Sequence, residues 1–385
     1  MASRTKLPTD WHFARPELAR HYLNAFEIGL VSGIALYARR RHGKSEFLTR
    51  DLQPAALAQG YAVGYCNLWQ EDEDPAQALA EAARALAMPK TVRAKLMARL
   101  QTPVTKFKLS GKAAVLGEGG AEVEFKDANA VGPRQLRDLF TRFDQSKNLG
   151  LLLIDEAQVL AQPQHAPLEK ALRALLDTRK DRLKVIFTGS SEDRLRAMFG
   201  AERKAFYNWA SVEPMPLLGE AFVRELTDRA NRLTTLQLKP VHSLAAFREL
   251  NGVPELFRRF LAQYLANPFE GAAAAVAQCK RSVYAEGGFD KRMRDLLPAD
   301  RYVLGLVAAG QEDLHSGDTL KKMGQELGLR RPASRAVPQN ALRRLRERQI
   351  LLAMGNGVYE FEDEAFREWV LEQRERLSET NSLRK

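Results

Sequence analysis

GIALYARRRHGKSEFLTR, residues 33–50, is the stretch that decides the fold of this 385-residue chain. A short apolar run typical of a β-strand leads into a tight basic loop, and a helical pattern follows. Gly43, Lys44 and Ser45 complete the pattern G-x-x-x-x-G-K-[ST]. In that pattern backbone N–H groups surround phosphates, the lysine reaches the terminal ones and the hydroxyl binds Mg²⁺. The start of the helix would add the positive end of its dipole, so the stretch predicts a phosphate-binding loop.

The loop departs from the pattern at its first position, where Ala38 replaces glycine. If that position requires a positive φ angle, alanine costs about 1 kcal/mol, which still allows the loop to form. The alternative is a basic turn before a helix, because a G-K-S tripeptide is common by chance. We expect the loop and its first helical residues to bind the nucleotide through Ala38, Arg39, Arg40, Arg41, His42, Gly43, Lys44, Ser45 and Glu46.

A second stretch, GLLLIDEAQVL at residues 150–160, follows about 110 residues later. A continuous apolar run that ends in two acids is typical of a strand buried in a parallel sheet, with carboxylates at its C-terminal edge. We expect Asp155 to hold Mg²⁺ through water and Glu156 to polarise an attacking water. The alternative is an ordinary core strand before an acidic helix start.

These motifs resemble those of a known family. YARRRHGKSEFL is similar to the loop of the AAA+ and STAND-like ATPases called the archaeal-type ATPase family, and LLLIDEAQ resembles their Walker B strand. VIFTGSS, residues 185–191, resembles the strand that carries the sensor 1 residue. The resemblance implies an ATPase that uses Mg²⁺. Strands that alternate with helices independently predict a parallel α/β sheet with helices on both faces.

Several polar residues are candidates for assisting catalysis by this resemblance. Asn67 ends the predicted strand 61–68 and would hold Glu156 in an inactive pose, although an asparagine that opens a turn is the simpler interpretation. Thr188 or Ser190 would touch the γ-phosphate or the lytic water. Arg203 would act as an arginine finger on a neighbouring subunit, with Arg194 and Arg196 as substitutes; an exposed basic turn is equally ordinary.

The turn Asn251-Gly252-Val253-Pro254 resembles the lid motif of these ATPases, in which the proline approaches the base. Arg258 would then be the sensor 2 residue. The match departs from initiator-type AAA+ proteins, because Glu255 stands nearer the glycine where their arginine lies. A plain turn between two helices is the alternative.

The C-terminal part predicts three helices and two short strands, which is the order of a winged helix. Its segment 330–348 holds seven arginines and a single acid beside an apolar stripe. One helix face would pack and the other would face DNA phosphates and bases. Alternatives are a solvated basic face and a surface that docks on an acidic protein or on the ATPase domain. The predicted DNA contacts are Arg335, Arg343, Arg344 and Arg346.

These patterns divide the chain into predicted domains. A nucleotide-binding domain spans 1–218 with a hairpin insertion near 103–127; a helical lid spans 219–290, a winged helix 291–377 and a frayed tail 378–385.

Composition sets the remaining expectations. Apolar residues make up 45% and charged residues 28% of the chain, as in soluble globular proteins. We expect a cytoplasmic protein that does not act in a membrane, because no secretory leader and no apolar run of about 18 residues occurs. Cys66 and Cys279 are too isolated for a disulfide framework or a zinc site. The net charge of +11 suits a polyanionic partner.

The sequence therefore predicts an AAA+-type ATPase that binds and hydrolyses MgATP to drive assembly or a change of shape, on double-stranded DNA and as a homo-oligomer. One alternative is a STAND-like regulatory switch with a protein partner, for example in phage defence, in which the winged helix acts as a brake. A third is a nucleotide-binding adaptor with negligible turnover, suggested by Ala38. No motif distinguishes ATP from GTP.

Overall fold

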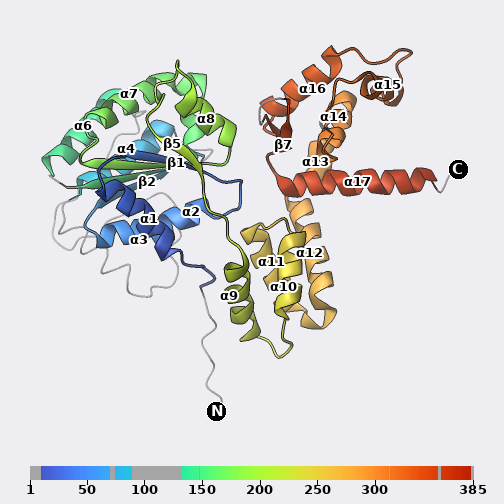
Figure 1. The fold of residues 1–385 in the computed structure, drawn as a ribbon, viewed down its shortest axis with the longest axis horizontal. Helices are drawn as coiled ribbons and strands as arrows, with labels where there is room; N and C mark the ends of the chain where they lie inside the picture. The colour runs from blue at the N-terminus through green and yellow to red at the C-terminus, as the bar shows by residue number, and fades with distance from the viewer. Residues whose placement is uncertain are drawn as a thin grey trace, which may run out of the picture.

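The computed structural model describes residues 10–69, 74–88, 132–146, 148–311, 313–353 and 357–382. Figure 1 shows an α/β lobe, a bundle of helices beside it and a C-terminal unit above that bundle. The predicted hairpin near 103–127 lies outside the described residues. Among the helices that are described, we find none with the length and apolar character needed to cross a lipid bilayer.

Five parallel strands form the sheet of the α/β lobe, in the order β2-β3-β4-β1-β5. The strands β3 and β4 are buried along their whole length, because both faces of the sheet are covered. This arrangement confirms the predicted fold class. The strands are β1 (Gly33–Tyr37), β2 (Ala62–Asn67), β3 (Gly150–Asp155), β4 (Leu183–Gly189) and β5 (Ser211–Pro214).

Alternate residues of the strands pack against two separate sets of helices. Leu151 and Leu153 belong to a core shared with α1, α2 and α3, whereas Leu152 and Ile154 belong to a core shared with α4, α6, α7 and α8. This division follows from the two-residue period of a strand. The helical elements are α1 (Pro16–Glu27), α2 (Lys44–Phe47), the π-helical turn η1 (Leu48–Leu52), α3 (Gln53–Ala58), α4 (Pro75–Ala87), α6 (Pro133–Gln145), the 3₁₀ turns η2 (Ala157–Ala161) and η3 (Pro163–His165), α7 (Ala166–Asp177) and α8 (Glu192–Gly200).

The helical bundle next to the sheet is organised by aromatic side chains. Phe222, Phe247 and Phe257 lie with ring centroids 5.5–5.8 Å apart. Asn251 and Gly252 adopt positive φ angles of 56° and 66°, which turns the chain sharply between two helices. The bundle contains α9 (Glu220–Asn231), α10 (Pro240–Glu249), α11 (Pro254–Ala266), η4 (Pro268–Glu270) and α12 (Gly271–Glu286).

In the C-terminal unit the short helix α13 precedes three helices and an antiparallel strand pair, and the order of these last five elements is the one predicted from the sequence. The predicted boundary at 290 lies within α13, whose Phe289 packs on Phe366 with ring centroids 4.9 Å apart. One apolar core runs from the bundle into this unit. Its elements are α13 (Phe289–Arg294), α14 (Pro298–Ala308), α15 (Gly317–Glu326), α16 (Ala336–Glu347), β6 (Leu351–Ala353), β7 (Tyr359–Phe361) and α17 (Glu364–Ser382).

The last helix, α17, continues to Ser382 and so extends into the segment 378–385, for which the sequence predicts a frayed tail. No proline or glycine interrupts residues 364–382, so nothing in the sequence ends the helix earlier. Cys66 and Cys279 are both free thiols and both buried.

The pair Arg344–Asp300 joins α16 to α14, and we expect it to stabilise the C-terminal unit. Three hydrogen bonds of 2.5–3.1 Å connect the guanidinium to a carboxylate that is 1% exposed. Replacing Arg344 with alanine leaves that carboxylate buried without its cation, which should destabilise the unit by about 2 kcal/mol. Urea unfolding followed by tryptophan fluorescence measures the loss.

The matched control for this prediction is Arg343→Ala on the same helix. Arg343 is exposed and lies 3.7 Å from Glu347, so its removal should change the free energy of unfolding by less than about 0.5 kcal/mol. Equal effects of the two substitutions would contradict a structural role for the Arg344–Asp300 pair.

Candidate nucleotide-binding site

The loop after β1 has the backbone conformation that its sequence requires. Gly43 has a φ angle of 81° and directly precedes α2, where a side chain is disfavoured. Arg15 donates a hydrogen bond of 2.9 Å to the carbonyl oxygen of Gly43. Among the described residues, Arg41 has a positive φ of 66° whereas Ala38 does not. Alanine at the first loop position therefore costs no backbone strain.

The side chain of Lys44 lies inside the loop and is only 5% exposed. Its Nζ atom donates to the carbonyl oxygen of Ala38 at 2.8 Å and to that of Arg39 at 3.3 Å. It also lies 3.6 Å from Oε1 of Glu156 on the neighbouring β3 segment. The structure thus brings together the lysine and the glutamate that the sequence predicts on separate motifs.

Asp155 is fully buried at the end of β3 and accepts several hydrogen bonds. Ser45 Oγ and Thr188 Oγ1 donate to its two carboxylate oxygens, and the backbone N–H of Glu156 donates at 3.1 Å. Burial and the nearby Asp155 carboxylate raise the pKa of Tyr65. Thr188, which the sequence predicts near the γ-phosphate or the lytic water, is fully buried, and its hydroxyl donates to Asp155.

The donor set of Ser45 and Asp155 fits Mg²⁺, which prefers hard oxygen ligands. A hydroxyl and a carboxylate are already in contact at the end of the loop. No cluster of three or more His, Cys, Asp or Glu side chains that could hold a metal occurs in the described ranges. Protein magnesium sites commonly use one or two carboxylates together with substrate phosphates.

Glu156 adopts a left-handed backbone conformation, with φ 55° and ψ 43°. One carboxylate oxygen, Oε2, accepts hydrogen bonds from Ser190 Oγ at 2.8 Å, Ser190 N at 3.1 Å and Gln158 Nε2 at 2.5 Å. Burial raises the pKa of this carboxyl, but Lys44 and these donors outweigh that effect and hold the pKa below its usual value. Glu156 is therefore a carboxylate at neutral pH.

Asn67 ends β2 and lines the same cavity as Glu156. Its side-chain oxygen accepts a hydrogen bond from the backbone N–H of Trp69 at 2.9 Å, which is the geometry of an asparagine that opens a turn. The side chains that donate hydrogen bonds to the Glu156 carboxylate are those of Ser190 and Gln158. The position of Asn67 agrees with the simpler of the two interpretations of its role.

A cavity of about 430 Å³ lies between the loop, the end of β2 and the helical bundle. Pro254 begins α11 at its edge, and Arg258 follows one turn later. Sequence reasoning missed Trp69, over which the guanidinium of Arg40 stacks at 4.0 Å. The lining residues are Arg40, Arg41, Gly43, Lys44, Ser45, Glu46, Asn67, Trp69, Glu156, Pro254, Glu255 and Arg258.

The helical bundle is tied to the loop helix through Glu46. Arg258 on α11 lies 2.9 Å from this carboxylate, and His12 contacts it at 3.1 Å. The other ring nitrogen of His12 contacts the buried Asp51 at 2.8 Å. Glu46 is thus an ionic link between two parts of the chain that border the cavity. Nothing in the sequence around His12 or Asp51 predicts this network.

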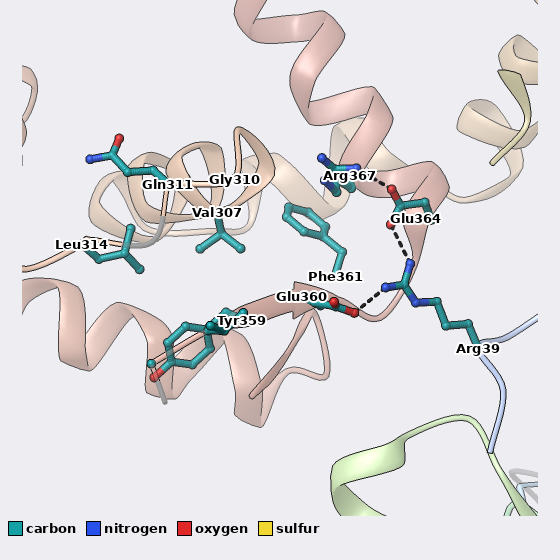
Figure 2. Close-up of a pocket in the computed structure, with 12 residues that line it drawn as sticks. Arg39, Val307, Gly310, Gln311, Leu314, Tyr359, Glu360, Phe361, Glu364 and Arg367 are labelled. Carbon is teal, nitrogen blue, oxygen red and sulfur yellow. Dashed lines mark hydrogen bonds and ion pairs between the residues drawn. The ribbon is translucent and has the colours of Figure 1, made fainter. Parts of the chain in front are cut away.

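The guanidinium groups of the three loop arginines contact carboxylates of other parts of the chain. Arg39 pairs with Glu360 and Glu364 of the C-terminal unit, beside a second cavity of about 320 Å³ (Figure 2). Arg40 lies 2.8 Å from Glu362. Arg41 lies 3.5 Å from Glu255 of α11. We call these ion pairs the arginine contact; it joins the loop to the bundle and to the C-terminal unit.

The remaining loop residue, His42, is buried, and its Nδ1 atom lies 3.0 Å from the carbonyl oxygen of Arg40. Burial lowers the pKa of the His42 imidazole, and the nearby charge of Lys44 adds to this effect. His42 therefore supports the shape of the loop.

The other predicted arginines lie away from this cavity. Arg203 is exposed in the segment between α8 and β5, and Arg196 pairs with Glu192 at 2.7 Å. Arg335, Arg343 and Arg346 are exposed at the start of α16 and along it. Arg344 is partly exposed, and its guanidinium is hydrogen-bonded to the buried Asp300.

Comparisons with known proteins bear on the fold. No protein-family model matches the sequence, and a search of curated proteins finds no match. Among solved structures, a Walker-type ATPase of Pyrococcus abyssi matches with a TM-score of 0.60 and 18% identity, over 96% of this chain and 99% of that one. The Aeropyrum pernix ORC2 protein, solved in ADPNP–ADP complexes, matches with a TM-score of 0.55 and 15% identity, over 95% and 93%. Both likenesses span nearly the whole chain and show an AAA+-type fold.

Proposed function

We propose that this protein is an AAA+-type ATPase that binds and hydrolyses MgATP and uses the cycle to change its shape or assembly. The contact between Ser45 and Asp155 carries the proposal, with Lys44 beside Glu156 in the same cavity. Two segments about 110 residues apart supply these four side chains. Their chemistry matches the lysine, hydroxyl, carboxylate and water-orienting residue that phosphoryl transfer to water requires.

Each residue has a distinct part in this mechanism. The N–H groups at the start of α2 and the ammonium of Lys44 bind the phosphates, and Lys44 exchanges its carbonyl partners for phosphate oxygens. Ser45 and Asp155 would hold Mg²⁺, which would supply positive charge to the phosphate oxygens. Glu156 orients the attacking water. Pro254 and Arg258 close the cavity from the bundle, and exposed Arg203 is available to a neighbouring subunit of a homo-oligomer.

Two substitutions separate binding from turnover. Lys44→Ala should weaken MgATP binding by at least tenfold, because it removes the ammonium that faces the phosphates. Glu156→Gln should keep the affinity within about threefold and lower phosphate release by at least a hundredfold, since water orientation matters in the transition state. Titration with a fluorescent nucleotide and a phosphate-release assay measure the two effects.

Lys170→Ala is the control for these variants, because Lys170 is exposed on α7 at a distance from the cavity. Its affinity and rate should match the parent protein. Parent protein that binds MgATP without releasing phosphate would favour the adaptor function, and unchanged binding by Lys44→Ala would contradict the phosphate-loop assignment.

We also propose double-stranded DNA as a partner of the C-terminal unit. The start of α16 and one face of this helix expose Arg335, Arg343 and Arg346. The opposite face packs into the C-terminal unit through Leu342 and Leu345. Such a helix presents its cations to phosphates while its apolar side holds it in the fold. The net charge of +11 favours the same partner.

The triple variant Arg335→Ala, Arg343→Ala, Arg346→Ala tests this interface. Its affinity for duplex DNA should fall, and the dependence of log affinity on log salt should flatten by roughly one unit for each phosphate that the protein no longer neutralises. Anisotropy titrations at several salt concentrations measure both. Arg134→Ala, Arg137→Ala, Arg142→Ala on α6 is the control with the same change of charge, and equal weakening by both triples would indicate non-specific attraction.

A second candidate function, a regulatory switch, is favoured by the arginine contact. Glu360, Glu362 and Glu364 of the C-terminal unit face the loop that the proposal assigns to phosphates. Glu362 is 5% exposed, and burial raises the pKa of its carboxyl although Arg40 and Arg194 oppose that effect. Carboxylates and phosphates are both anions that arginine binds, so nucleotide and C-terminal unit would compete for the loop.

Neutralising these acids tests the switch. The triple variant Glu360→Gln, Glu362→Gln, Glu364→Gln should bind MgATP about three- to tenfold more tightly, because the loop arginines become available to phosphates. Asp318→Asn, Glu326→Gln, Glu347→Gln removes the same charge from exposed positions of α15 and α16 and should leave affinity unchanged. Unchanged or weaker binding by the first triple would exclude competition at the loop.

A further inference from the structure

The two oxygens of the Glu156 carboxylate have different surroundings. Three hydrogen bonds, from Gln158 Nε2 and from the hydroxyl and backbone N–H of Ser190, all end on Oε2. The other oxygen, Oε1, lies 3.6 Å from Lys44 Nζ, and both residues line the 430 Å³ cavity. One oxygen is therefore held by protein donors, while the other is directed towards the lysine that the proposed function assigns to phosphates.

The fold builds this arrangement from two adjacent strand ends. Glu156 follows β3 in a left-handed conformation, and the short η2 helix then brings the amide of Gln158 back to the carboxylate. Gln158 is 3% exposed and also donates to Ser190 Oγ at 3.2 Å. Gly189 at the end of β4 leaves the space for this amide, because an added Cβ would collide with Gln158 Oε1 and with Leu195.

The terminal torsion of a glutamate side chain is broad and has no strongly preferred angle. A carboxylate on such a torsion keeps one orientation only when external groups fix it. Hydrogen bonds to an ionised acceptor are among the stronger ones in proteins, and three of them converge on Oε2. Their direct consequence is that Oε1 stays directed into the cavity, where a water beside a phosphate would lie.

We propose that Gln158 and Ser190 are positioning residues for ATP hydrolysis, which hold Oε2 of Glu156 so that Oε1 orients the attacking water. This inference rests on the proposed ATPase function. It differs from the roles predicted from the sequence, in which Ser190 touches the phosphate or the water itself. Neither residue contacts the nucleotide in this scheme; both act through Glu156.

Gln158→Leu and Ser190→Ala test the proposal, because each removes side-chain donors while keeping most of the side-chain volume. Each should lower kcat for phosphate release by about tenfold or more, while the affinity for MgATP stays within twofold. Ser190→Ala keeps the hydrogen bond from the backbone N–H of residue 190 to Glu156. Gln158→Leu should therefore lower kcat by at least as much as Ser190→Ala. Gln162→Leu, at the end of η2, is the control and should keep the parent kcat.

A double variant distinguishes positioning from general damage. In a Glu156→Gln background, Gln158→Leu should cause no further loss of the residual rate, because the residue acts only through the carboxylate. Thermal unfolding of each variant shows whether a lower rate comes from misfolding instead of a misplaced carboxylate. If Gln158→Leu is unstable, Ser190→Ala still tests the proposal.

The outcomes are distinct. Parent protein without phosphate release refutes the proposed function and this inference with it. Parent protein that is active, with an unchanged or higher kcat for Gln158→Leu or Ser190→Ala, refutes the positioning role alone. The positioning role is also refuted if Gln158→Leu lowers the residual rate of the Glu156→Gln variant by the same factor as it lowers the rate of the parent protein.

Discussion

Parallel pairing of β1, β4 and β3 is the constraint on which the rest of the structure depends. Because the strands run in one direction, their carboxyl ends meet at one edge of the sheet, where Tyr37 is in register with Gly189 and Asn67 with Asp155. The loop after β1, the acids after β3 and the hydroxyls at the end of β4 then converge without long connections. The site is a consequence of the pairing, and the apolar runs inside the strands fix that pairing by burial on both faces.

Burial makes the charges at this edge depend on one another. Asp155 is fully buried and Lys44 nearly so, and an isolated charge in such a place is strongly disfavoured. Hydrogen bonds from Ser45 and Thr188 and the proximity of Lys44 to Glu156 supply the compensation within the chain. Glu46 also has polar partners, since it contacts His12 and forms an ion pair with Arg258 that connects the loop helix to the bundle.

The sequence was informative where a pattern has a single physical cause. Continuous apolar strands, alternating helices and the glycine before Lys44 predicted the sheet and the place of the loop. It was less informative where the outcome depends on residues distant in the chain. Thr188 faces Asp155 because β3 and β4 are neighbours, and Arg39 contacts Glu360 across 321 residues. Gln158 had a signal, since it is the last letter of IDEAQ, but its role depends on the left-handed conformation of Glu156.

The apolar core shared by the bundle and the C-terminal unit has a mechanical consequence. Two units joined by a continuous core resist separation, whereas their contacts with the α/β lobe are the arginine contact, the pair of Glu46 with Arg258 and the packing of Phe13 on Phe222. The bundle and the C-terminal unit would then move as one body relative to the sheet, and a shift of α11 at the cavity would be passed on to α16 and its exposed arginines.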